Sequence, residues 1–134
     1  MFKPLFLILA LAVVAAACER RPDEAEARRF AGRVLKGTLA YPRSTLIGVS
    51  AGKDAAELRF VTLVDAQQVA DWFRTALPLN HWELEHDAVN QDGSIVIYAK
   101  QGERPLWITL TPNSGAPGAT YTMIGAVVEG DSIR

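Results

Sequence analysis

The sequence predicts an α+β fold, in which two helices pack on an antiparallel sheet of about six strands in the order α-β-β-α-β-β-β-β. Two segments carry apolar residues every three or four positions, which is typical of helices that dock on a core. The other apolar segments have the alternation or composition of strands and are separated by turn sequences. Because strands and helices do not alternate along the chain, we expect an antiparallel sheet.

The first predicted helix begins near Asp23 and stops at Gly37. Asp23 follows a proline and precedes two glutamates in the first turn, where the helix dipole favours acidic side chains. Spacings of three and four residues place one apolar stripe on this helix, formed by Ala27, Phe30, Ala31 and Val34. This stripe must pack against the rest of the domain.

The second predicted helix opens at Asp65, which together with Gln68 resembles a capping box, and it ends at Pro78. Its apolar face consists of Val69, Trp72, Phe73, Ala76 and Leu77. Turn signals at residues 41–44 and 51–54 indicate two strands before this helix. After it, the segments WELEHDAV, SIVIYAK, LWITLT and ATYTMIGAVV predict a four-stranded meander.

Gly102 and Glu103 suit a two-residue hairpin turn, because glycine supplies the positive φ that such a turn needs. The resulting register pairs Tyr98 with Trp107, Ile97 with Ile108 and Ala99 with Leu106. The face that we expect the helices to cover carries Leu58, Phe60, Trp82, Leu84, Ile95, Ile97, Leu106, Ile108 and Leu110.

The segment NHWELEHD is the richest polar cluster. In a strand, His81, Glu83, Glu85 and Asp87 point one way, and Trp82, Leu84 and His86 point the other. A turn at residues 92–93 pairs Glu85 with Lys100 and places His86 opposite Ala99, whereas a four-residue loop shifts the pairing by two and keeps the faces. Because side chains on one strand face are about 6.5–7 Å apart, we expect a solvated acidic face and no metal site.

The composition narrows the function. A chain of 134 residues suits one domain, and a net charge of −1 offers no basic surface for nucleic acid. The single cysteine cannot form an intramolecular disulfide or a multi-cysteine zinc site. The few serines sit mostly in turns, and the glycines lack the spacing of a phosphate-cradling loop. We therefore expect a protein that is not an enzyme, with no catalytic residue, no cofactor, no metal and no nucleic-acid partner.

The N-terminus has the parts of a secretory signal. Lys3 gives a positive start, an apolar run covers residues 4–14, and three alanines lead into Cys18. The apolar stretch is shorter than the roughly 20 residues of a permanent membrane-spanning helix. Two alternatives stay open: an ordinary cut after an A-x-A pattern, which leaves a free cysteine, and an uncleaved anchor.

These residues resemble bacterial lipoprotein signals, in which small residues precede a cysteine that is lipidated. Ala16, Ala17 and Cys18 match that pattern, whereas Ala15 stands where leucine is usual. The resemblance implies a cleaved signal peptide over residues 1–17, a lipidated N-terminus and short tether over 18–22, and one α+β domain over 23–134. Acyl chains such as palmitate on Cys18 would then hold the protein at the membrane.

Glu19 follows the cysteine and bears on the choice of membrane. Inner-membrane retention in lipoproteins of enteric bacteria uses aspartate at this position, and glutamate is not that signal. We therefore predict a protein in the cell envelope that faces the periplasm, in the outer membrane in preference to the inner membrane.

A predicted open sheet face supplies the candidate partner-binding residues, which are Val96, Tyr98, Trp107 and Thr109. Val89 is expected on the same face, with Thr122 and Ile124 as a continuation. Tyrosine and tryptophan dominate binding hot spots, so an uncovered patch of this kind is typical of an interaction site. In the alternative interpretation, the first helix covers this face through Phe30 and Val34.

The element order over about Thr45–Val128 is similar to that of small α+β modules in envelope lipoproteins, such as the C lipoprotein of the outer-membrane β-barrel assembly machinery. We therefore predict a lipid-anchored periplasmic binding or scaffold protein with an envelope protein as its partner. The alternatives are a membrane-held inhibitor or immunity-type protein and a small periplasmic hydrolase.

We predict that the mature protein begins at lipidated Cys18. Mass spectrometry of the N-terminal peptide from purified envelopes should give the mass of an acylated cysteine, because the resemblance implies acyl chains on Cys18. An unmodified Cys18 at the mature N-terminus would contradict the prediction.

Overall fold

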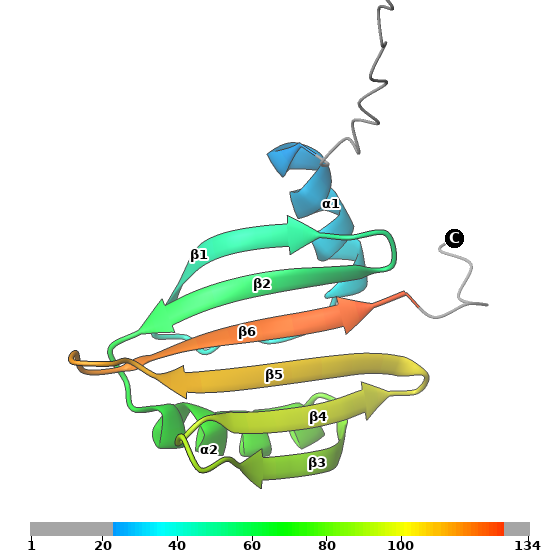
Figure 1. The fold of residues 1–134 in the computed structure, drawn as a ribbon. Helices are drawn as coiled ribbons and strands as arrows, with labels where there is room; N and C mark the ends of the chain where they lie inside the picture. The colour runs from blue at the N-terminus through cyan, green and yellow to red at the C-terminus, as the bar shows by residue number, and fades with distance from the viewer. Residues whose placement is uncertain (1–22, 128–134) are drawn as a thin grey trace, which may run out of the picture.

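The computed structural model describes residues 23–127, and it confirms the predicted α+β class and element order (Figure 1). Cys18 and the predicted signal peptide lie outside the described residues. The elements are α1 (Glu24–Val34), β1 (Ser44–Ala51), β2 (Ala55–Thr62), α2 (Ala66–Leu79), β3 (Glu83–Val89), β4 (Ile95–Gln101), β5 (Arg104–Pro112) and β6 (Ala119–Ala126).

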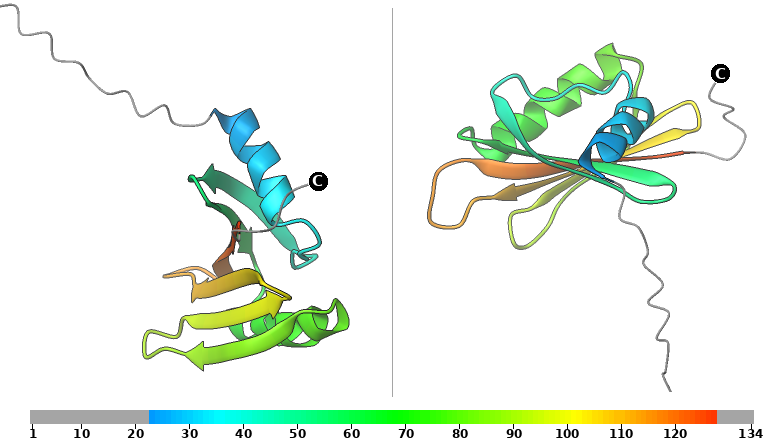
Figure 2. Two further views of the ribbon diagram at one scale, coloured as in Figure 1. Left: turned by 90° about the vertical axis from the view of Figure 1, so that its right-hand side faces the viewer. Right: turned by 90° about the horizontal axis from the view of Figure 1, so that it is seen from above.

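The strands form one sheet of six strands in the order β1-β2-β6-β5-β4-β3, and each neighbouring pair is antiparallel. Both helices lie on the same face of this sheet (Figure 2). α1 packs mainly against β1 and β2, and α2 packs against β3, β4 and β5. The opposite face is therefore left without a helix in the described part of the chain.

The helix starts agree with the sequence. The carboxylate of Asp23 accepts a hydrogen bond from the backbone N–H of Glu26 at 2.8 Å, and Asp65 accepts one from the N–H of Gln67. The predicted end of α2 at Pro78 is wrong, because the helix includes Pro78 and continues to Leu79. Hydrogen bonds from the next N–H groups to the carbonyl oxygens of residues 77 and 78 close this last turn.

The core lies between the helices and the sheet. Most of the predicted helix-side face is confirmed, since Ile97, Leu106, Ile108 and Leu110 are fully buried, while Leu58 and Leu84 are half-buried at its margin. The predicted register of β4 with β5 is also confirmed, with Tyr98 opposite Trp107. Gly102 has a φ of 61° in the two-residue connection between them.

The predicted faces of β3 are partly wrong because a β-bulge interrupts this strand between Leu84 and His86. The extra residue of a bulge reverses the faces of all residues that follow it. His86 therefore lies opposite Tyr98 on the uncovered face, and not opposite Ala99 on the apolar side. Asp87 lies opposite Ile97, on the helix side.

The pairing of β3 with β4 follows neither predicted register over its whole length. Glu83 pairs with Lys100 before the bulge, as the shifted alternative requires, but Val89 pairs with Ile95 after it. The connection runs over residues 90–94, where the carboxylate of Asp92 accepts hydrogen bonds from the N–H and the hydroxyl of Ser94. Both hydrogen bonds hold the pKa of Asp92 below its ordinary value, and the bond from the Ser94 hydroxyl has the larger effect.

Among the glycines of residues 23–127, Gly118 is the one whose replacement should be most damaging. It has a φ of 99°, and a Cβ at this position would collide with the backbone of Thr62 and Leu63. We predict that Gly118→Ala lowers the free energy of unfolding by about 3 kcal/mol or more, as measured by urea denaturation.

Gly115→Ala is the matched control for this experiment. Gly115 lies in the same loop with a φ of 69°, but a Cβ there meets no atom within 4 Å. It should cost only the backbone strain of about 1 kcal/mol. Equal losses in the two variants would contradict the steric explanation.

Candidate functional site

The predicted partner-binding residues come together on the uncovered face of the sheet. Val96 pairs with Thr109 and Tyr98 pairs with Trp107 across β4 and β5. The rings of Tyr98 and Trp107 stack with their centroids 5.1 Å apart and their planes at 28°. The side chain of Trp107 keeps 38% of its surface exposed. The four residues therefore form one contiguous group that solvent can reach.

The interpretation in which the first helix covers this face is wrong. α1 ends above Gly125 of β6, which belongs to the helix-side face with Met123 and Tyr121. A Cβ on Gly125 would lie only 2.8 Å from Leu35 and 2.9 Å from Val34. The absence of a side chain on this glycine thus lets α1 settle on the side opposite to the aromatic pair.

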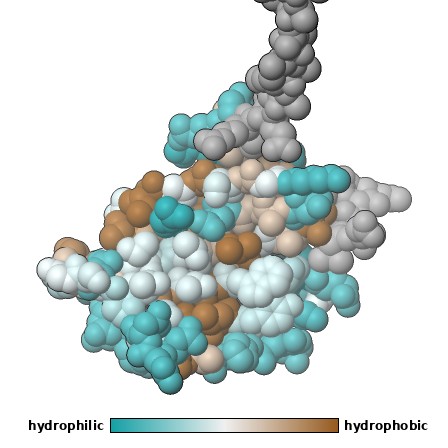
Figure 3. Space-filling view, in the orientation of Figure 1, coloured by the Kyte–Doolittle hydropathy of each residue, from teal (hydrophilic) through white to brown (hydrophobic). Residues whose placement is uncertain are grey.

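The predicted continuation onto β6 is present, because Ile124 pairs with Trp107 and Thr122 pairs with Thr109. Val89 does not belong to this face, since the bulge in β3 turns it to the helix side, opposite Ile95. We call the resulting surface the open-face patch and define it as Val96, Tyr98, Trp107, Thr109, Thr122 and Ile124. Figure 3 shows this side of the molecule, with apolar and weakly polar groups over the middle of the sheet and hydrophilic groups mostly around it.

Charged and titratable side chains border the open-face patch, including one that the sequence interpretation placed elsewhere. His86 is exposed beside Tyr98, and Glu83 pairs with Lys100 at the β3 edge. On the other side, the guanidinium of Arg59 contacts Glu57 at 3.1 Å, and these residues pair with Thr122 and Ile124. The patch thus has an apolar centre and a rim of both charge signs.

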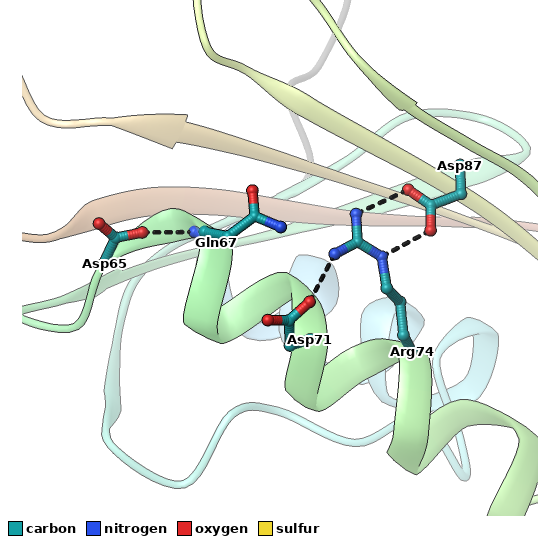
Figure 4. Close-up of polar contacts among 5 residues, drawn as sticks. All are labelled: Asp65, Gln67, Asp71, Arg74 and Asp87. Carbon is teal, nitrogen blue, oxygen red and sulfur yellow. Dashed lines mark hydrogen bonds and ion pairs between the residues drawn. The ribbon is translucent and has the colours of Figure 1, made fainter.

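The predicted acidic face of β3 does not exist as one surface. Asp87, on the helix side, accepts two hydrogen bonds from the guanidinium of Arg74 of α2, at 2.6 and 2.9 Å (Figure 4). Arg74 also donates to Asp71 at 2.7 Å. Hydrogen bonding to Arg74 holds the pKa of Asp87 below its ordinary value, and desolvation opposes this only in part. The ion pair of Asp87 with Arg74 therefore connects α2 to β3, an edge strand of the sheet.

His81 also leaves the predicted acidic face. It has a φ of 67° and lies in the turn after α2, before β3 begins. Within residues 23–127, no group of three or more His, Cys, Asp or Glu side chains is placed to hold a metal ion.

A second candidate surface lies beside α1 and was not predicted from the sequence. It is a hollow of about 340 Å³ between α1, the 38–40 segment and the β1–β2 hairpin. Its lining is mostly apolar and consists of Arg28, Ala31, Gly32, Leu35, Thr38, Ala40, Leu46, Val49, Leu58, Phe60 and Met123. At its rim, Leu46 of β1 keeps 40% of its surface exposed, which indicates an incomplete cover over this edge of the sheet.

The single charged residue of this hollow is Arg28. Its guanidinium donates to Glu24 one helical turn earlier, at 2.7 Å. Because this one cation is already paired with Glu24, the hollow suits an apolar molecule.

The family model of START domain-like proteins matches residues 43–120, which is more than half of the chain. The chain belongs to the START domain-like family. The matched part runs from the start of β1 to the beginning of β6 and includes α2, but not α1. Membership of this family is compatible with a function in binding. Searches of curated proteins and of solved structures found no match.

Neither α1 nor α2, the two helices of the described residues, is long and apolar enough to cross a membrane.

Proposed function

We propose that this START domain-like protein is a non-catalytic binding domain of the bacterial cell envelope, anchored by lipid on Cys18 and facing the periplasm. The observation that carries the proposal is the open-face patch, where a stacked pair of aromatic side chains lies on a sheet face that no described helix covers. Its partner is an envelope protein, for which the domain acts as an accessory or scaffold.

The geometry of the patch supports a protein partner. Stacking of Tyr98 on Trp107 restricts both rings before binding, so little side-chain entropy remains to be lost. The neighbouring threonines and Ile124 extend the contact area across three adjacent strands. A centre of aromatic residues with a charged rim is the usual composition of a protein interface.

The proposed anchor would keep this surface near the membrane. Glu24, the first residue of α1, follows Cys18 by six residues, which span at most about 20 Å when fully extended. The outer membrane is the proposed location, and an envelope protein close to its surface is the proposed partner. A membrane-held inhibitor would use the same patch on a single toxin or enzyme.

We predict that a photo-crosslinking amino acid at position 107 forms one discrete adduct in living cells. Position 63 is the control, because Leu63 is 82% exposed and a contact driven by exposure alone would favour it over Trp107. A crosslinker at position 122 should give the same adduct. The yield of this adduct should fall at least about tenfold when Tyr98→Ala and Trp107→Ala are also present.

The identity of the adduct separates the proposed functions: a component of an envelope assembly supports the scaffold, and a single toxin or enzyme supports the inhibitor. The double variant must keep its thermal unfolding transition for the comparison to count. Equal adduct yields from positions 63 and 107 would contradict a role for the open-face patch.

The hollow beside α1 favours a second candidate function, the binding of a small apolar molecule. Its lining is mostly apolar, and membership of the family is compatible with a function in binding. This candidate uses the helix side of the sheet and does not depend on the open-face patch.

We predict that the anionic dye 1-anilinonaphthalene-8-sulfonate binds in this hollow. Ala40→Trp should weaken binding about tenfold by filling the exposed rim, as measured by fluorescence titration, whereas Leu63→Trp should leave the affinity unchanged. Equal dye affinity in the unsubstituted protein and in Ala40→Trp would contradict the candidate.

A further inference from the structure

A separate hollow lies on the other side of α1 and is strongly cationic. It has a volume of about 370 Å³ and opens between α1 and the turn that joins β1 to β2. Arg29 and Arg33 come from the helix, Lys53 comes from the turn, and Glu26 is the one acidic residue of the lining. Three positive charges against one negative charge give the lining residues a net charge of +2.

The cations of this hollow differ from the neighbouring Arg28 in their ion pairing. Arg28 is paired with Glu24, but none of Arg29, Arg33 and Lys53 forms an ion pair with another residue of the described range 23–127. The guanidinium of Arg33 lies over the ring of Phe30, 5.8 Å from its centre. Because Phe30 also lines the hollow, this contact holds the Arg33 head at its wall.

We propose that this hollow binds a phosphate group. Guanidinium groups donate paired hydrogen bonds that match phosphate oxygens, and a lysine ammonium adds a mobile point charge. Two positions on one helix face and a third on a facing turn line the same volume, which places all three cations around one hollow. A phosphate bound among these cations would also offset the repulsion between them.

The phosphate can come from a free phosphate ester or from a lipid headgroup, and the second source rests on the proposed anchor at Cys18. Arg33 lies nine residues after Glu24 along α1, a rise of about 14 Å. With the short tether before α1, the hollow would stay within reach of the headgroups of the anchoring membrane.

The test measures acylation of Lys53 in the full chain by an amine-reactive reagent, and mass spectrometry of peptides digested after the reaction reports Lys53 separately from the other lysines. In nonionic micelles, inorganic phosphate should slow the reaction of Lys53 at least about threefold, because the bound anion shields its ammonium group, and chloride at the same ionic strength should not. Lys36, exposed and outside this hollow, is the internal control.

Arg29→Gln with Arg33→Gln should abolish the protection of Lys53, whereas Arg43→Gln, which removes a charge elsewhere, should preserve it. If the double variant loses its helical circular dichroism, Arg33→Gln alone should still raise the phosphate concentration needed for half-protection by about threefold or more.

Bilayer discs separate the two sources of phosphate. Protection in phosphatidylglycerol discs, but not in discs of zwitterionic phosphatidylcholine, would assign a lipid headgroup, and protection by inorganic phosphate alone would assign a free phosphate ester. No protection in either setting would overturn the phosphate site. The micelle arm does not depend on lipidation, so an unmodified Cys18 would count against the anchor and not against this site.

Discussion

The pairing of β2 with β6 is the interaction on which the rest of the structure depends. It joins the N-terminal hairpin to the C-terminal meander through eight residue pairs, from Ala55 with Ala126 to Thr62 with Ala119. After β2 the chain continues into α2 and not into β6, the strand that pairs with β2. α2 carries the chain across the sheet, so that β3, β4 and β5 form on the far side of β6. This pairing therefore fixes which edges β1 and β3 occupy.

The same pairing separates the two faces of the sheet. On the helix side, Phe60 stacks on Tyr121 with centroids 4.9 Å apart, and the Tyr121 hydroxyl accepts a hydrogen bond from the N–H of Tyr41 at 3.0 Å. Burial raises the pKa of the Tyr121 hydroxyl, so this group stays a neutral hydrogen-bonding partner for the segment after α1. On the other side, Thr122 and Ile124 alternate with these buried residues and extend the open-face patch.

Regular parts of the fold were predictable from the sequence, and interrupted parts were not. Strict alternation and a glycine turn determine the faces and register of β4 and β5, so the positions of Tyr98 and Trp107 followed directly. The bulge in β3 has no glycine or proline to mark it. Its extra residue places His86 and Asp87 each on the face opposite to the predicted one. The hollows beside α1 depend on how this helix leans over the hairpin, which periodicity does not describe.

The distribution of side chains makes the proposed binding events separable. α1 lies between an apolar hollow that contains Arg28 and a cationic hollow that contains Arg33, so one short helix forms a wall of both. The open-face patch lies across the sheet from them, beyond the buried layer of Ile108 and Met123. A change at Trp107 therefore removes contact area from one face without altering the charges around α1. The proposed protein partner on the open face and the proposed anion beside α1 do not compete, because the two surfaces share no side chain.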